Sequence, residues 1–118
     1  MKRVTIITVN FNQPLLTELF LNSVTAHNTY PAIEIIVVDN GSQENLIKSW
    51  QSSYPEVRFI RSEKNLGFAG GNNLGIREAN AEYLFLVNND TEFSADLIEK
   101  LVAVLDSNPQ VGAISPKI

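Results

Sequence analysis

The chain has 118 residues, and its 9 lysines and arginines against 13 aspartates and glutamates give a net charge of −4. This length favours one globular domain, and a hydrophobic content of 44% excludes disordered and low-complexity classes. The absence of cysteine excludes disulfides and thiolate metal sites and favours a cytoplasmic location. The dispersed basic residues argue against a nucleic-acid surface, and no apolar run approaches the roughly 20 residues that span a bilayer.

Apolar, mostly β-branched runs predict five strands. In chain order they cover residues 4–9, 33–38, 57–60, 83–87 and 111–114. Because apolar residues in these runs are continuous and do not alternate with polar ones, both faces of the sheet are expected to be buried, as in a parallel sheet.

Helical patterns separate the strands. Pro14 stands near the start of the first helix, and Ser42 is a candidate cap of the second. A short third helix is predicted over residues 72–79, and Ser94 is a candidate cap of the fourth. The alternation predicts an α/β fold with an open, mainly parallel sheet and helices on both faces. In such sheets ligands bind beyond the carboxyl ends of the strands.

The first strand is followed by Asn10 and Asn12, with no glycine cluster and no acid. A dinucleotide-binding turn, a P-loop or the paired acids of a phospho-receiver would stand here, so none of these three sites is indicated. The two amides are interpreted either as loop and cap residues or as ligand contacts.

The second strand is followed by Asp39 and the turn at residues 40–42. A carboxylate at the sheet edge can accept a hydrogen bond from a ligand N–H, such as the imide of a pyrimidine base. An acid is also favoured near the amino end of a helix, so both interpretations stay open at this point.

The third strand is followed by residues 65–75, which contain four glycines and three asparagines. Glycines let the backbone approach a ligand closely, and the amino end of the following helix suits a diphosphate. The alternative is a flexible loop without a ligand.

The fourth strand is followed by Asn88 and Asp90. Divalent cations such as magnesium take oxygen ligands, and one carboxylate with one amide can hold an ion that a diphosphate also binds. The alternative is a turn that leads into the next helix.

Taken in order, residues 8–12, 35–42, 65–75 and 86–90 resemble the family 2 glycosyltransferases, and most closely their rhamnosyltransferase-like branch. These are inverting enzymes with the GT-A fold, which is a Rossmann-like nucleotide-diphospho-sugar transferase fold. The resemblance implies one nucleotide-sugar-binding domain over residues 1–118, truncated after the fifth strand and without the acceptor half.

The resemblance also implies the partners. The donor is a UDP- or dTDP-linked sugar, the cofactor is a divalent metal, magnesium or manganese, and the acceptor is a glycan or a lipid-linked molecule. The implied role is polysaccharide or cell-surface glycan synthesis. The protein would act in the cytoplasm, with possible peripheral association at the inner face of the membrane.

Site residues follow from the same resemblance. Asp39 takes the N3–H of uracil or thymine, while Asn10 and Asn12 line the base and ribose pocket. The nucleotide is bordered by five residues of the glycine-rich segment, which are Asn65, Gly67, Gly71, Asn72 and Asn73; many relatives have arginine in place of Asn72.

The metal and the catalytic base complete the implied site. Asp90 binds the metal as the second acid of the D-x-D motif, and Asn88 stands in place of the first acid, so metal binding without nucleotide is expected to be weak. The general base is expected beyond residue 118. The chain alone is therefore predicted to bind nucleotide and to transfer sugar poorly or not at all.

Two other α/β classes are less well supported. A sugar-nucleotide pyrophosphorylase would carry a glycine-rich, basic loop after the first strand, and residues 10–14 contain neither feature. A receiver-like module would carry a phosphorylatable aspartate after the third strand, where residues 61–64 read Arg-Ser-Glu-Lys.

Overall fold

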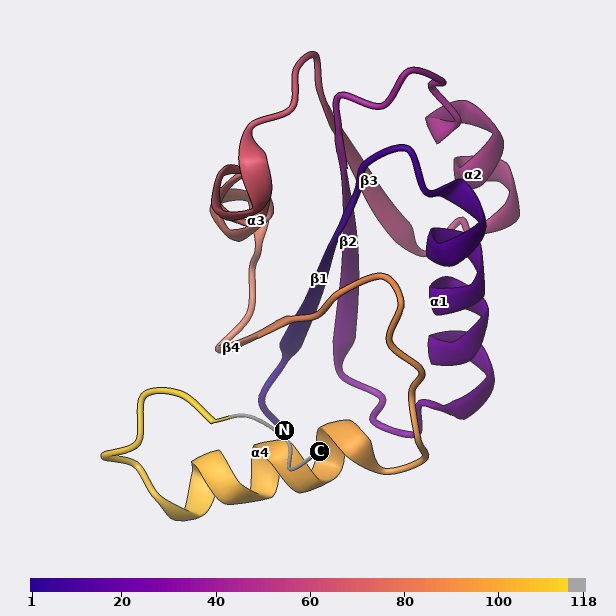
Figure 1. Cartoon of the computed structure of the whole chain (residues 1–118). Coiled ribbons are helices and arrows are strands. Elements are labelled where there is room, and N and C mark those ends of the chain that lie inside the picture. The colour runs from indigo at the N-terminus through magenta and orange to yellow at the C-terminus, as the bar shows by residue number, and fades with distance from the viewer. Residues whose placement is uncertain (115–118) are drawn as a thin grey trace.

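The structure, a computed structural model of the chain, describes residues 1–114 and alternates strands with helices throughout (Figure 1). The elements are β1 (Val4–Asn10), α1 (Pro14–His27), β2 (Ile33–Asn40), α2 (Ile47–Ser53), β3 (Val57–Ser62), α3 (Gly67–Glu78), β4 (Tyr83–Leu86) and α4 (Leu97–Ser107).

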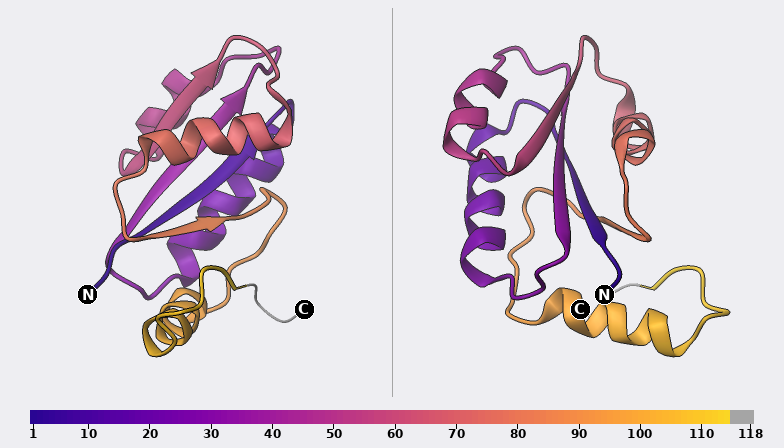
Figure 2. Two further views of the ribbon diagram at one scale, coloured as in Figure 1. Left: turned by 90° about the vertical axis from the view of Figure 1, so that its left-hand side faces the viewer. Right: turned by 180° about the vertical axis from the view of Figure 1, so that it is seen from behind.

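The four strands form one sheet in the order β3-β2-β1-β4, and every pairing is parallel. Helices α1 and α2 cover one face of the sheet and α3 covers the other, while α4 lies beneath the amino end of β1 (Figure 2). The predicted α/β architecture, with a parallel sheet and helices on both faces, is confirmed.

The core is divided by the sheet into two clusters. The larger cluster lies under α1 and α2, where Trp50 stacks on Phe59 with ring centroids 5.6 Å apart and Phe20 meets Phe93 edge-on at 5.8 Å. The smaller one lies under α3 and includes Ile7 and residues of β2. Burial on both faces explains the continuous apolar runs of β1 and β2.

The glycine-rich segment is mostly helix, because α3 begins at Gly67 and not at residue 72. Gly71 and Gly75 face the sheet. A Cβ on Gly75 would lie 2.6 Å from Cγ2 of Ile7, and one on Gly71 would lie 3.1 Å from Cγ1 of Val9. Small residues here let α3 approach β1 closely, so the segment is not a flexible loop.

The two predicted serine caps are wrong. Helix α2 begins after Leu46 and α4 begins after Asp96, which has a left-handed φ of 58°, and neither cap residue makes a side-chain cap hydrogen bond. Ser42 lies five residues before α2, and its hydroxyl bonds to groups at the carboxyl ends of β1 and β2.

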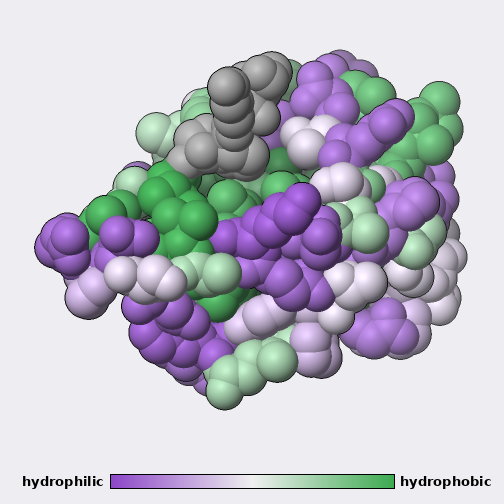
Figure 3. Space-filling model, turned by 90° about the horizontal axis from the view of Figure 1, so that it is seen from below, coloured by the Kyte–Doolittle hydropathy of each residue, from purple (hydrophilic) through white to green (hydrophobic). Residues whose placement is uncertain are grey.

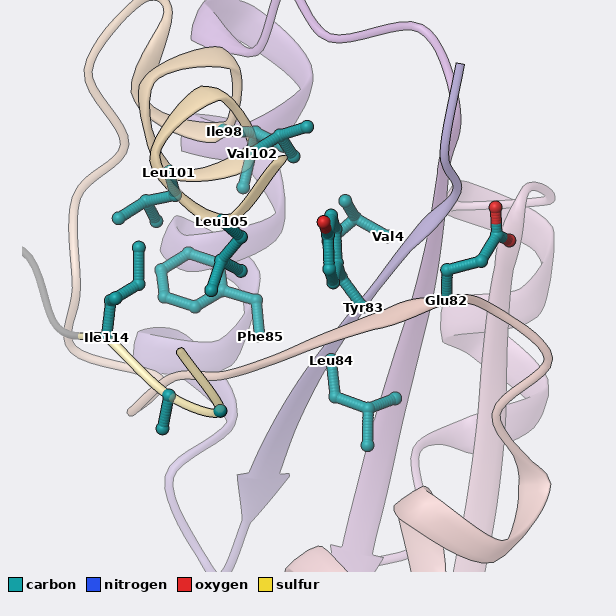
Figure 4. A pocket seen from close by; sticks show the side chains of 12 residues that line it. Val4, Glu82, Tyr83, Leu84, Phe85, Ile98, Leu101, Val102, Leu105 and Ile114 are labelled. Atoms are coloured by element: carbon teal, nitrogen blue, oxygen red, sulfur yellow. The ribbon is translucent and has the colours of Figure 1, made fainter. Parts of the chain in front are cut away.

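The predicted fifth strand at residues 111–114 is wrong, so the described sheet has four strands. Residues 112–114 instead line a cavity of about 320 Å³ between β4 and α4, beside Phe85 and Leu105 (Figure 4). A run of four apolar residues does not distinguish a strand from another packed segment. Seen from below, apolar residues gather on one side of this end of the molecule (Figure 3).

Candidate functional site

The carboxyl ends of β1, β2 and β3 lie at the top of Figure 1, and each carries a polar residue of one row across the sheet. Asn10 of β1 pairs in register with Asp39 of β2, which pairs with Arg61 of β3. Residues in register on parallel strands point to the same face, here the face covered by α1 and α2. Asn10 and Asp39 are each 2% exposed, whereas the Arg61 side chain is 20% exposed.

The Asp39 carboxylate is held from three directions. Its Oδ1 accepts hydrogen bonds from Nδ2 of Asn10, at 3.2 Å, and from the hydroxyl of Ser42. Its Oδ2 accepts from Nη1 of Arg61, while Nη2 of Arg61 donates to the Ser42 carbonyl oxygen at 2.9 Å. The charge of this buried acid is therefore paired, as burial requires.

The loops after β1 and β2 are bonded to each other. The Ser42 hydroxyl accepts the Asn12 N–H at 2.9 Å and Nδ2 of Asn10 at 3.2 Å, and Oδ1 of Asn12 accepts the Gln43 N–H at 2.8 Å. Asn12 adopts a left-handed φ of 54°, which asparagine tolerates better than most residues. Asn10, Asn12 and Ser42 line a cavity of about 250 Å³. We call the row and these two loops the base-side network.

Asn40 fixes the start of α3. Its Nδ2 donates to Oδ1 of Asn65 at 3.1 Å and to the Gly67 carbonyl oxygen at 3.0 Å, and its Oδ1 accepts the Leu66 N–H at 3.0 Å. Gly67 has a φ of 78°, a conformation suited to glycine, and a Cβ there would meet nothing within 4 Å. The chain before α3 is therefore positioned by β2.

A second cavity, of about 360 Å³, lies between the loop after β1, the start of α3 and the segment after β4. It is lined by Asn65, Gly67, Asn88 and Asp90, together with the apolar residues Val9, Phe11 and Phe68. Asn88 and Asp90 are exposed, and the four ion pairs formed within residues 1–114 do not include Asp90. We call this cavity the metal-side groove.

A chain of buried hydrogen bonds joins the two regions. Asn89, between Asn88 and Asp90, is 7% exposed and donates from Nδ2 to Oγ1 of Thr17 at 3.1 Å. The Thr17 hydroxyl in turn donates to Oδ1 of Asn10 at 2.9 Å. The segment that carries Asp90 is thereby tethered to α1 and to the base-side network.

The ten predicted site residues fall into three groups. Asn10, Asn12 and Asp39 lie in the base-side network, and Asn65, Gly67, Asn88 and Asp90 share the metal-side groove. The other three lie in α3: Gly71 and Asn72 are buried, and Asn73 is exposed but lines neither cavity. The Asn72 amide donates to the Phe68 carbonyl oxygen at 3.2 Å within the same helix.

Five residues of the site were not predicted as site residues: Thr17, Asn40, Ser42, Arg61 and Asn89. Arg61 directly follows the third predicted strand, so parallel pairing of the second and third strands is the signal that could have placed it beside Asp39. Asn40 and Asn89 lie within the stretches 35–42 and 86–90 that carry the family resemblance, but the resemblance assigned them no contact, and nothing distinguishes Thr17 from an ordinary helix residue.

The side-chain oxygens of Asp90 and Asn88 in the metal-side groove suit a hard divalent cation that is also coordinated by a bound ligand. Among the described residues, no group of three or more His, Cys, Asp or Glu side chains is positioned to hold a metal ion. One carboxylate and one amide supply only two oxygen ligands, but magnesium sites commonly take the rest from waters and substrate phosphates. The residues therefore fit a cation bound together with a diphosphate.

Comparisons with known proteins identify a family and several relatives. Residues 5–117 match the family described as glycosyl transferase family 2. An uncharacterized glycosyltransferase of Haemophilus influenzae is 31% identical over 92% of the chain and 36% of its own length. A low-salt glycan biosynthesis hexosyltransferase of Haloferax volcanii is 37% identical over 72% of the chain and 28% of its own length.

A synthase of a bacterial polysaccharide is also similar. The poly-beta-1,6-N-acetyl-D-glucosamine synthase of Staphylococcus epidermidis is 30% identical over 73% of the chain and 21% of its own length. The chain therefore spans about a third or less of the length of these curated relatives.

Solved structures share the fold. A mannosyltransferase from Pyrobaculum calidifontis, in complex with GDP-Man and Mn2+, superposes with a TM-score of 0.85 at 27% identity and covers 97% of the chain and 35% of its own. TarS of S. aureus, in complex with UDP-GlcNAc, gives a TM-score of 0.73 at 21% identity and covers 98% of the chain and 37% of its own. The parallel sheet with its helices therefore has the GT-A fold of nucleotide-sugar transferases.

Proposed function

The chain belongs to glycosyl transferase family 2, and from this premise we propose that it is the donor-binding domain of an inverting glycosyltransferase. The proposed donor is a nucleotide-diphosphate sugar held with a divalent metal. One observation carries the proposal: a paired carboxylate, Asp39, and an exposed one, Asp90, stand at the same edge of the sheet and are joined by the Asn10–Thr17–Asn89 tether.

The base-side network is the proposed site of the base and ribose. Asp39 is fixed by Asn10, Ser42 and Arg61, so its orientation is set before a ligand arrives. Asn10 and Asn12 line the neighbouring cavity, where the exposed Asn12 amide can bond to ribose or base while Asn10 holds Asp39 in place. A prepared acceptor of this kind avoids reorganisation on binding, which raises affinity.

The metal-side groove is the proposed site of the diphosphate. Asp90, with Asn88, would hold the cation, while Asn65 and Gly67 border the phosphates from the start of α3. A bound divalent cation stabilises the negative charge that develops on a departing diphosphate. The Mn2+ in the structure of the 27% identical mannosyltransferase supports the use of a divalent metal.

Transfer of the sugar requires more than these residues. An inverting reaction needs a base that deprotonates the acceptor hydroxyl opposite the leaving diphosphate. We place that base, and the binding of a glycan or lipid-linked acceptor, in the part of the protein that corresponds to the remaining length of the relatives. The synthase relative supports a role in polysaccharide or cell-surface glycan synthesis. The 118-residue chain alone is expected to bind donor and to transfer little or no sugar.

Calorimetric titration of the chain with UDP, once with Mn2+ and once with EDTA, tests the proposal. We expect binding with Mn2+, strong weakening with EDTA, loss of binding in Asp39→Ala, and loss of the metal dependence in Asp90→Ala. The matched control is Glu56→Ala, because Glu56 is an exposed acid just before β3, at the opposite end of the sheet. A folded chain that does not bind UDP with Mn2+, or that binds UDP equally well with EDTA, would contradict the proposal.

A further inference from the structure

We propose that Arg61 is a base-specificity residue, which restricts Asp39 to one free acceptor position and thereby selects the imide edge of uracil or thymine over guanine. The inference rests on the proposed function, because it concerns the base of the same donor. It starts from a contact that the sequence analysis did not anticipate, the pairing of the partly exposed Arg61 with the buried Asp39.

The acceptor positions of Asp39 are nearly filled. An ionised carboxylate offers about four lone-pair positions, two on each oxygen. Oδ1 already accepts from Nδ2 of Asn10 and from the Ser42 hydroxyl, and Oδ2 accepts from Arg61. One position remains, on Oδ2, beside the guanidinium.

The bases differ in how many acceptor positions they need. Uracil and thymine present one N–H between two carbonyl oxygens, so a single acceptor suffices. Guanine presents two adjacent N–H groups, which pair with a carboxylate by using both of its oxygens. A guanine facing Asp39 would leave a buried N–H without a partner, and unpaired polar groups are the strongest basis for rejecting a ligand.

Arg61 has free N–H donors for the carbonyl oxygens of uracil or thymine. A guanidinium has five N–H donors, and Arg61 uses one on Asp39 and one on the Ser42 carbonyl oxygen. Its side chain is 20% exposed while that of Asp39 is 2% exposed, so Arg61 is the more accessible member of the pair. The pair presents one acceptor beside several donors, which complements the alternating acceptor and donor groups of an imide edge.

The pair is difficult to explain by stability alone. Removing two charges from water costs several kcal/mol per ion, and apolar residues of similar size often serve a fold equally well. The same strand carries a contrasting arginine: Arg58 pairs with Glu78 of α3 at 2.8 Å, and its side chain is 51% exposed. That pair joins β3 to α3 in the ordinary way of a surface ion pair.

The test compares UDP, dTDP and GDP binding, with Mn2+, in the unmodified chain and in Arg61→Met, with Arg58→Met as the matched control. We expect the unmodified chain and the control to bind UDP and dTDP about tenfold or more tightly than GDP, a selectivity that a hydrogen-bonded site can provide. In Arg61→Met, UDP binding should weaken and the ratio of UDP to GDP affinity should fall by about tenfold. Should Arg61→Met fail to fold, Arg61→Lys, which keeps the charge but loses the planar fork, should lower the same ratio.

Three other outcomes would overturn the inference, and they show whether the proposed function fails with it. If Arg61→Met weakens all three nucleotides equally, Arg61 supports binding without reading the base. If the unmodified chain binds GDP as tightly as UDP, nucleotide binding stands but the selection does not. If no nucleotide binds a folded chain, both the inference and the donor-site proposal fail.

Discussion

The base-side network and the metal-side groove lie at the same edge of one sheet, yet they are built differently. In the network, Asn10, Asp39 and Ser42 are buried and bonded to one another and to Arg61. In the groove, Asn88 and Asp90 are exposed, and only the Asn89 between them is buried.

This difference in burial indicates which part of the site has its final geometry before a ligand binds. A buried network keeps its geometry because a lost partner would leave a charge or an amide unpaired. Exposed oxygen ligands keep their solvation and give it up only for a cation. We infer that the base side is preorganised and that the metal side is completed by the cation and the diphosphate together.

The largest expected effect comes from breaking the base-side network. Asp39→Ala leaves the Arg61 guanidinium, 20% exposed, without its ionic partner, and it also removes an acceptor from Asn10 and Ser42. Removing the acid of this partly buried pair, together with the acceptor of two buried hydrogen bonds, should cost about 2–4 kcal/mol of unfolding free energy. Urea denaturation measures it, with Glu56→Ala as the control. A cost below about 1 kcal/mol would mean that the network does not stabilise the fold.

The next effect concerns α3, whose first residues line the metal-side groove. Gly75→Ala places a Cβ 2.6 Å from Cγ2 of the buried Ile7, and the helix must shift away from β1. Overpacking costs about 1–3 kcal/mol, less the gain of up to about 1 kcal/mol that alanine brings to a helix. Denaturation of the variant should show a net loss. A variant as stable as the unmodified chain would show that α3 is not closely fitted to the sheet.

The third effect concerns the Asn89–Thr17 hydrogen bond, which connects the metal-side groove to the base-side network. Asn89→Ala removes the donor to Thr17 and should cost about 1 kcal/mol, whereas Asn88→Ala, an exposed neighbour, should stay within about 0.5 kcal/mol. Asn89→Ala should also weaken Mn2+-dependent UDP binding more than it weakens any binding in EDTA. Equal costs for the two asparagines would contradict the tether.

The smallest effect lies at the opposite end of the sheet. Hydrogen bonding from Tyr83, and next from Lys2, holds the pKa of Asp106 below its ordinary value of 3.8. A lowered folded-state pKa adds stability above the unfolded value, and that stability is lost as pH falls through the folded value. The stability difference between the unmodified chain and Asp106→Asn should therefore shrink below about pH 3.8, as thermal unfolding can measure, while UDP binding at neutral pH stays unchanged.

Much of the fold was predictable because buried strands leave a strong pattern. The runs at residues 4–9 and 33–38 coincide with β1 and β2 within two residues, and Asp39 stands at the expected strand end. The run at residues 111–114 carried the same pattern but is not a strand, since four apolar residues also fit the packing between β4 and α4.

The site was harder to predict because its contacts join distant residues. Asp39 and Arg61 are 22 positions apart, and Thr17 and Asn89 are 72 apart. The glycines of residues 65–75 suggested a loop around a ligand, but Gly71 and Gly75 allow a close helix-to-sheet contact, a need that composition alone does not reveal.

The most direct test is titration of the chain with Mn2+, in the absence and in the presence of saturating UDP. It asks whether the metal-side groove binds its cation only together with the nucleotide. Asp90 and Asn88 supply two ligands, so we predict weak Mn2+ binding alone and binding at least about tenfold tighter with UDP, a gain that Asp90→Ala removes. Equal Mn2+ affinity with and without UDP would contradict the account.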